Sequence, residues 1–172
     1  MKEDGRLHFI MTGGTIDSSY NPVKETTVPS EHSYIPMFVP FLQLYEEVEF
    51  TEVFMKDSRD ITDSDRSKVL EAIEKSSSKR IIITHGSYTV AETARYVQEY
   101  LQSKDRTIIF VCSLIPIEGF APTDAGFNLG YAVGKSQNLG EGVYVCMNGR
   151  VFSPDEVVKI LETGRFASTY TK

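Results

Sequence analysis

Apolar positions along the chain form five short runs that predict buried β-strands. The runs over Leu7–Met11, Arg80–Thr84 and Thr107–Ser113 are almost continuously apolar and rich in β-branched or aromatic residues. That pattern is typical of strands covered on both faces of a sheet. Two further strands are expected over Glu47–Met55 and Gly142–Met147.

Between these runs, apolar residues recur at helical spacing. The expected helices cover Asp63–Ser76, Thr89–Leu101, Phe127–Leu139 and Pro154–Thr163. Thr62 or Asp63 would cap the first of them, and the last would have Ser153 as its N-cap and Pro154 at its first position. Alternating strands and helices predict an α/β fold with an open, mostly parallel sheet and helices on both faces. We therefore expect a flavodoxin-like or Rossmann-like three-layer sandwich.

The segment 17–40 departs from this pattern. It carries four prolines among polar residues and shows no clear period until Tyr34. A long loop directly after the first strand is often a lid or a binding loop. The total length of 172 residues suits a single domain over 1–172, in which residues 17–40 would form an active-site lid.

Charge and composition exclude several classes of function. The net charge of -6 argues against a basic nucleic-acid-binding surface, and the apolar runs are far shorter than the ~20 residues that cross a bilayer. The first ten residues are too charged for a signal peptide, so a cytoplasmic protein is expected. Cys112 and Cys146 lie inside strand-like runs, which favours buried thiols over a disulfide framework or a metal site.

Candidate chemistry gathers where three of the expected strands end, at Thr12–Ile16, Lys56–Thr62 and Thr84–Thr89. In an open parallel sheet, ligands bind outside the carboxyl ends of the strands. The Gly13-Gly14 pair permits a tight turn and could present backbone N–H groups to an oxyanion. Ser87 would lie near a helix N-terminus, where anions are favoured. These signals are modest alone, because such turns also occur in nucleotide-binding proteins and Thr89 could serve simply as a helix cap.

Four segments, taken in order, strengthen the case: MTGGTIDS, MKDSRDIT, ITHGSYTVAETARYV, and the stretch from APTDAGFNLGYAV through GVYVCMNGRVFSPDEVVK. Together they resemble the bacterial-type L-asparaginase family, specifically its larger amino-terminal domain, over Leu7 to Lys159. MTGGTIDS resembles the first signature of that family and ITHGSYTVAETARYV resembles its second signature. The last threonine of the first signature is the nucleophile in the family, which corresponds to Thr15. The serine of the second segment contacts the substrate, which corresponds to Ser58, and the catalytic lysine falls on Lys159.

The resemblance implies hydrolysis of L-asparagine to L-aspartate and ammonia through an acyl-enzyme on Thr15, with no metal or organic cofactor. The implied catalytic residues are Thr15, Tyr20, Ser87 and Lys159, with Tyr34 as the alternative to Tyr20. The implied substrate-binding residues are Gly14, Asp57, Ser58, Gly86 and Tyr88. His85 belongs to the second signature, and we interpret it as a structural hydrogen-bonding residue. Because a neighbouring subunit helps to complete each site in the longer enzymes, we also expect a homo-oligomer.

Three departures from the family pattern limit this interpretation. The Thr-Asp pair of the second signature is Ser87-Tyr88 here, an Arg-Pro step is Ile115-Pro116, and the chain resembles the amino-terminal domain alone. The first departure removes the usual carboxylate partner of the substrate α-ammonium. The candidates to replace it are Asp57, Asp60, Glu118 and Asp124.

Two other functions remain open at this point. One is a catalytically weak or inactive amino-acid-binding relative of the asparaginases, which lost activity together with the carboxylate at position 88. The other is a small nucleoside- or nucleotide-processing protein that uses the Thr12–Thr15 turn for phosphate or sugar. The paired hydroxyl groups of Thr15 and Ser87 argue against this last alternative.

Overall fold

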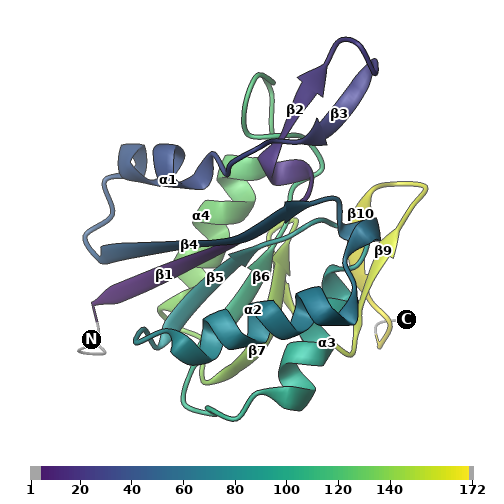
Figure 1. Cartoon of the computed structure of the whole chain (residues 1–172). Helices are drawn as coiled ribbons and strands as arrows, with labels where there is room; N and C mark the ends of the chain where they lie inside the picture. The colour runs from purple at the N-terminus through teal and green to yellow at the C-terminus, as the bar shows by residue number, and fades with distance from the viewer. Residues whose placement is uncertain (1–4, 171–172) are drawn as a thin grey trace.

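A six-stranded sheet in the order β4-β1-β5-β6-β7-β8 forms the centre of the computed structural model, which describes residues 5–170 (Figure 1). The strands are β1 (Arg6–Gly13), β4 (Glu47–Lys56), β5 (Arg80–Thr84), β6 (Thr107–Val111), β7 (Gly142–Met147) and β8 (Arg150–Phe152). All neighbours pair in parallel except β8, which is antiparallel to β7. The five parallel strands follow the flavodoxin-like order. The expected α/β fold class is confirmed.

Helices cover both faces of this sheet (Figure 1). One face packs against α2 (Asp63–Lys75) and α3 (Val90–Tyr100), and the other against α1 (Ile35–Phe38) and α4 (Ala125–Ser136). Successive strand residues point to opposite faces, so the isoleucines of β5 are divided between the two cores: Ile81 and Ile83 join the α2–α3 layer, whereas Ile82 joins the α1–α4 layer. This double burial explains the continuous apolar runs in the sequence.

The start of α2 is fixed by reciprocal hydrogen bonds. The Thr62 hydroxyl accepts from the backbone N–H of Asp65, and the Asp65 carboxylate accepts from the backbone N–H of Thr62 at 3.0 Å. Lys56, at the end of β4, donates to the same carboxylate at 2.8 Å and, with the hydrogen bonds from Thr62, holds the Asp65 pKa far below its usual range. The predicted cap at Thr62 is therefore confirmed.

The segment 17–40 contains more regular structure than its sequence pattern predicts. After a 3-10 turn over Thr15–Asp17, β2 (Ser18–Asn21) and β3 (Thr26–Pro29) form an antiparallel hairpin. The chain then enters α1 and a second 3-10 turn, Val39–Leu42. The hairpin projects beyond the end of the sheet where β1 and β4 finish (Figure 1). Hairpins of this kind lack a buried face, so their strands leave little alternation in the sequence.

The expected helix over Pro154–Thr163 is wrong. The chain instead forms a hairpin in which β9 (Val157–Ile160) pairs antiparallel with β10 (Arg165–Ser168). Val157, Val158 and Ile160 are β-branched and favour an extended backbone. Gly164 adopts a φ of 67°, which lets the chain reverse between the strands. Lys159 consequently lies on a strand and not on a helix face.

Both cysteines, Cys112 and Cys146, are free and buried, as predicted. Burial raises the pKa of the Cys146 thiol to about 12 and that of Cys112 further still.

Among residues 5–170, no helix is long and apolar enough to cross a membrane. The same residues contain no group of three or more His, Cys, Asp or Glu side chains arranged to hold a metal ion. Residues 1–4, on which the expectation about a signal peptide partly depends, lie outside the described residues.

Candidate active site

Two glycines bring the first and second signature segments into backbone contact. A Cβ atom on Gly14 would lie 2.3 Å from the Cα atom of Gly86, and Gly14 also has a φ of 78°. A Cβ atom on Gly86 would lie 2.6 Å from the Cβ atom of Ser58. Only glycine fits at these two positions, since real Cβ atoms do not approach other atoms so closely. The carboxyl ends of β1, β4 and β5 therefore converge on one point at the switch in strand order, where open α/β sheets bind ligands.

Thr15 and Ser87 each follow directly after one of the two touching glycines. Thr15 begins the 3-10 turn and is half-buried, whereas Ser87 is only 3% exposed. The turn is held by hydrogen bonds from the Asp17 N–H to the Gly14 carbonyl and from the Ser18 N–H to the Thr15 carbonyl. The Gly14 N–H itself donates to the carbonyl of Lys56 at 2.8 Å. It is therefore not free to bind an oxyanion, and we assign Gly14 a steric role.

Lys159 reaches this site from the β9–β10 hairpin. Its Nζ atom lies 2.7 Å from the Ser87 Oγ atom, although 72 residues separate the two in the chain. Burial lowers the Lys159 pKa, so a neutral amine becomes accessible at lower pH than for an ordinary lysine. A neutral amine can accept the hydroxyl proton of a serine, whereas an ammonium group can only donate to it.

Tyr88 stands at the sequence position where the family's second signature has an aspartate. The side chains of Lys159 and Arg59 lie against its ring. The Lys159 Nζ atom lies 4.3 Å from the ring centroid, and the Arg59 guanidinium carbon lies 5.1 Å from it. Both distances fall within the range of cation–π interactions. The Tyr88 side chain is 53% exposed. It lines an open groove of about 450 Å³ between α3 and the β9–β10 hairpin, together with Ser87 and Lys159.

Two of the carboxylates that are candidate partners of the substrate α-ammonium group, Asp57 and Asp124, already have hydrogen-bond partners within the chain. Asp57 accepts hydrogen bonds from the N–H and guanidinium of Arg59, with the closest guanidinium nitrogen at 2.7 Å, and these bonds lower the Asp57 pKa. Asp124 accepts from the backbone N–H groups of Leu114 and Ile115 and from Asn128. Both carboxylates thus have partners within the chain, which leaves them less available to an α-ammonium group.

Two of the remaining contacts connect loops around the site. The Thr89 hydroxyl donates to the carbonyl of Ser58 at 2.7 Å and thereby connects two signature loops. Thr89 is the N-cap residue of α3, but its side chain makes no capping hydrogen bond to the helix. The Ile117 N–H donates to the carbonyl of Ile16 at 3.1 Å. This bond places the loop that carries the half-buried Glu118 against the turn of Thr15.

The two candidate tyrosines lie on the segment after Thr15. Tyr20 is on β2, pairs with Thr27 across the hairpin and is 55% exposed. Tyr34 is half-buried at the start of α1. Within residues 5–170, neither tyrosine hydroxyl is hydrogen-bonded to Thr15. The structure therefore brings Ser87 to Lys159 but does not bring either tyrosine into contact with Thr15.

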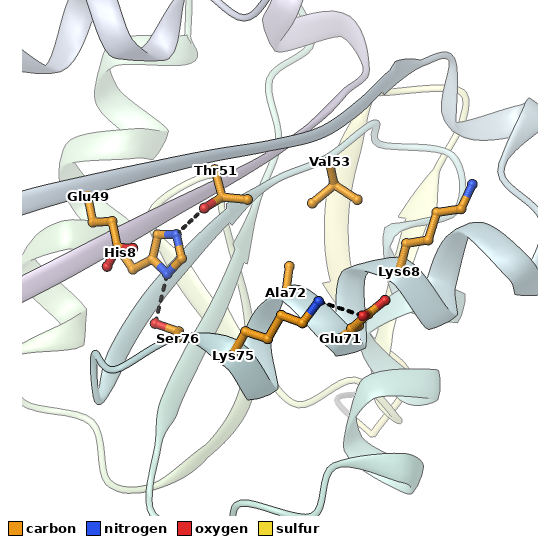
Figure 2. A pocket seen from close by; sticks show the side chains of 9 residues that line it. All are labelled: His8, Glu49, Thr51, Val53, Lys68, Glu71, Ala72, Lys75 and Ser76. Atoms are coloured by element: carbon orange, nitrogen blue, oxygen red, sulfur yellow. Dashed lines mark hydrogen bonds and ion pairs between the residues drawn. The ribbon is translucent and has the colours of Figure 1, made fainter.

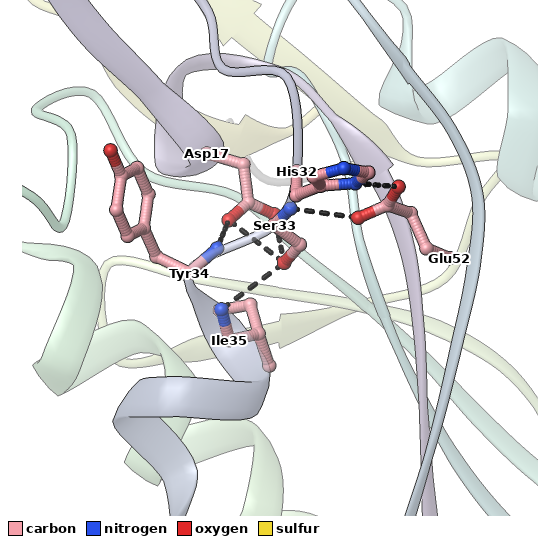
Figure 3. Close-up of polar contacts among 6 residues, drawn as sticks. All are labelled: Asp17, His32, Ser33, Tyr34, Ile35 and Glu52. Atoms are coloured by element: carbon pink, nitrogen blue, oxygen red, sulfur yellow. Dashed lines mark hydrogen bonds and ion pairs between the residues drawn. The ribbon is translucent and has the colours of Figure 1, made fainter.

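Two buried polar residues frame the site. His85 is fully buried, its Nδ1 atom lies 2.9 Å from the carbonyl of Gly86, and burial lowers its pKa to about 4. It is therefore neutral at pH 7, in agreement with a structural role. Asp17 is also fully buried. Its carboxylate contacts Ser33 and Tyr34 (Figure 3) and also the Thr84 hydroxyl. Sequence reasoning missed Asp17, whose only signal was a carboxylate directly after Thr15-Ile16.

A second hollow, of about 380 Å³, lies between β4 and α2. Its buried His8 is held by the Ser76 hydroxyl at 2.7 Å and the Thr51 hydroxyl at 2.8 Å (Figure 2), and burial lowers the His8 pKa. Lys75 is paired with Glu71 at 2.6 Å along α2. Because these polar groups already satisfy one another, we regard the hollow as part of the framework.

The doubly wound fold, together with the Gly14–Gly86 contact that brings Thr15 and Ser87 to the same end of the sheet, matches an amino-terminal domain of the asparaginase type. The family described as "Asparaginase, N-terminal" matches residues 6–169, so the chain belongs to this family. A glutaminase-asparaginase of Acinetobacter glutaminasificans is 27% identical over 162 residues, which cover 88% of this chain and 48% of the relative.

Solved asparaginases share the fold. The thermostable L-asparaginase of Thermococcus kodakarensis superposes with a TM-score of 0.81 at 22% sequence identity. The superposition covers 97% of this chain and 52% of the Thermococcus chain. L-asparaginase I of Vibrio cholerae superposes with a TM-score of 0.80 at 22% sequence identity, covering 95% of this chain and 51% of the Vibrio chain. The chain thus spans about half the length of the relatives that it matches.

Proposed function

We propose that the chain is an amidohydrolase that converts L-asparagine to L-aspartate and ammonia through an acyl-enzyme on Thr15. The observation that carries this proposal is the 2.7 Å contact between Lys159 and Ser87, set beside the Gly14–Gly86 contact that places Thr15 at the same end of the sheet. A hydroxyl nucleophile needs a neighbouring base, and a lysine whose pKa is lowered can supply one.

In the proposed reaction, the Thr15 Oγ atom attacks the side-chain amide carbon of the substrate and forms a tetrahedral oxyanion. Collapse of this intermediate breaks the C–N bond, releases ammonia and leaves an ester on Thr15. Water then attacks the ester, releases L-aspartate and restores the hydroxyl. Neutral Lys159 accepts the proton of Ser87, which allows Ser87 to relay protons to and from the reacting groups.

The segment 17–40 serves in this proposal as the lid, and Tyr20 as the residue that activates Thr15. In the structure Tyr20 lies on an exposed strand of the hairpin. Movement of the hairpin toward the site on substrate binding would bring its hydroxyl to Thr15 and exclude water. Tyr88 lines the groove beside Ser87, Ser58 and Gly86 pack against each other next to Ser87, and these three residues contact the substrate in this proposal. A second subunit closes the site in a homo-oligomer.

A second candidate function is that of an amino-acid-binding relative with little or no activity. Tyr88 in place of a carboxylate, together with the pairing of Asp57 with Arg59, favours it, because the α-ammonium group of asparagine then lacks an evident partner. The two functions are separated by measuring ammonia release and heat of binding on the same preparation.

The experiment supplies asparagine and glutamine to the purified chain. The proposed enzyme releases ammonia from asparagine faster than from glutamine, since an extra methylene in a rigid pocket typically costs ~1–3 kcal/mol of transition-state binding. Binding of asparagine without ammonia release would establish the second function. Equal or faster turnover of glutamine would contradict the proposed substrate preference.

A further inference from the structure

The buried carboxylate of Asp17 lies two residues after Thr15, at the point where the β2–β3 hairpin leaves the body of the protein. Asp17 accepts hydrogen bonds from the Tyr34 N–H at 2.8 Å and from the Ser33 hydroxyl at 2.9 Å (Figure 3). The hydroxyl of Thr84, the last residue of β5, lies 3.4 Å from the same carboxylate. The side chain thus connects the start of α1 with the strand that leads to Gly86 and Ser87.

Backbone contacts of Asp17 hold both ends of the hairpin. Ser18 begins β2 directly after Asp17, and the Ser30 N–H, just beyond β3, donates to the Asp17 carbonyl at 2.9 Å. The Ser18 hydroxyl also donates to the Gly14 carbonyl at 2.9 Å. A displacement of the hairpin base is therefore transmitted directly to the Gly14–Thr15 backbone.

The ionisable groups that face Asp17 come from neighbouring elements. Glu52 of β4 accepts from the Ser33 N–H at 2.8 Å and from His32 at 3.0 Å (Figure 3). Ser33 thus donates to two carboxylates: its N–H donates to Glu52 and its hydroxyl donates to Asp17. Burial, reinforced by the charge of Glu52 and opposed by the hydrogen bonds from Tyr34, Ser33 and Thr84, raises the Asp17 pKa to about 6.

A purely structural role does not explain a carboxylate at this position. A group whose pKa is raised by burial destabilises the folded protein when it ionises. An asparagine could still accept from the Tyr34 N–H through its single carbonyl oxygen. The feature that only the ionised carboxylate offers is a second acceptor oxygen. The Oδ1 atom receives both the Tyr34 N–H and the Ser33 hydroxyl, whereas the Oδ2 atom lies 3.0 Å from the Ser33 Oγ atom and 3.4 Å from the Thr84 hydroxyl.

We propose that ionised Asp17 is a positioning residue, which holds the hairpin base in the arrangement that orients the Thr15 turn for attack. This inference rests on the proposed function of Thr15. It adds that the lid segment and the nucleophile turn are fixed by one side chain, so that the lid and Thr15 act as a coupled unit. Protonation of Asp17 removes one acceptor and loosens both.

Asp17→Asn tests this role, with Glu52→Gln as a matched control that alters a neighbouring carboxylate on β4, which binds Ser33 but does not contact the Thr15 turn. Asp17→Asn should lower kcat for asparagine at least tenfold with less than a threefold change in KM, whereas Glu52→Gln should stay within threefold of wild type. Wild-type kcat should fall more steeply as the pH is lowered through about 6, beyond the decrease that protonation of Lys159 causes, and this additional step should be absent in Asp17→Asn. Ser33→Ala, which removes only the hydroxyl donor, should change kcat in the same direction.

Amide hydrogen exchange provides a readout that does not depend on activity. In Asp17→Asn, exchange should accelerate across 18–34 relative to both wild type and Glu52→Gln. If Thr15→Ala is fully active, the proposed function fails, but accelerated exchange would still show that Asp17 holds the hairpin. Wild-type exchange and wild-type kcat in Asp17→Asn, equal losses in Asp17→Asn and Glu52→Gln, or an effect on KM alone would overturn the positioning role.

Discussion

Replacing Asp17 by asparagine should change how stability depends on pH, and the size of the effect follows from the burial of the carboxylate. The Asp17 side chain is fully buried, and its pKa rises from 3.8 to about 6 in the folded protein. At about 1.4 kcal/mol per pKa unit, this difference corresponds to about 3 kcal/mol of unfolding free energy.

The sign follows from which form the folded state prefers. Folded Asp17 binds its proton more tightly than unfolded Asp17 does, so its contribution to stability is complete below the unfolded pKa. That contribution is lost as the pH rises through the folded pKa of about 6. Asparagine does not titrate, so the variant lacks this loss.

The assay is urea unfolding followed by circular dichroism, on wild type and Asp17→Asn, at intervals from pH 4 to pH 8. Carboxylates with lowered pKa values, such as Asp65, destabilise both proteins equally in acid and cancel in the difference. The stability of the variant relative to wild type should therefore increase by about 2 kcal/mol from pH 4 to pH 8, because pH 4 lies just above the unfolded pKa of 3.8 and part of the full difference is already present there. A difference that stays constant over this range would refute the assignment of an ionised, buried Asp17.

Four further outcomes are expected. Lys159→Met should abolish turnover, and wild-type activity should rise with pH on the alkaline side because Lys159 must lose its proton; near-normal activity of the variant would remove Lys159 from the mechanism. Tyr88→Asp should move this alkaline ionisation upward, since an anion beside a lysine favours the ammonium form; an unchanged profile would contradict the contact between them. Tyr20→Phe should lower kcat much more than substrate affinity, and unchanged kinetics would transfer the role to Tyr34. Light scattering should show an assembly larger than the 19.4 kDa chain; an active monomer would exclude the expected closure by a second subunit.

The sheet was predictable because burial on both faces leaves a direct signal in the sequence. The runs around Phe9, Ile82 and Ile109 are continuously apolar since their neighbours pack against opposite helix layers. The alternation of strands and helices predicted the mostly parallel sheet, whereas the choice of the flavodoxin-like strand order over the Rossmann-like one came from the structure. The resemblance itself covers the part of the chain that the family comparison later matched.

The two hairpins were not predictable in the same way. The β9–β10 strands are short, and Val158 and Ile160 are partly exposed, so their apolar residues mimic the spacing of an amphipathic helix. Pro154 after Ser153 reinforced that interpretation, although it occurs in a turn here. The resemblance pointed to Lys159 independently of its local conformation, because it depends on sequence order alone, and the structure brings this lysine to 2.7 Å from Ser87.

The partners of the site carboxylates depend on tertiary contacts that spacing does not reveal. Asp17 meets Ser33 and Tyr34 only after the hairpin has reversed the chain. The pairing of Asp57 with Arg59 is local, yet nothing in the sequence distinguishes it from a free carboxylate that could receive a substrate. The predicted segments therefore converge as expected, whereas the hydrogen bonds among them had to come from the structure.

The central claim is that Thr15 carries the acyl group, and steady-state ammonia release from asparagine by Thr15→Ala tests it most directly. The substitution removes one hydroxyl from a turn whose backbone hydrogen bonds remain, so the circular dichroism and the unfolding midpoint should match those of wild type. The account predicts that the folded variant loses nearly all turnover. A variant that keeps more than about a tenth of wild-type turnover, equivalent to only ~1.4 kcal/mol, would show that Thr15 is not the nucleophile.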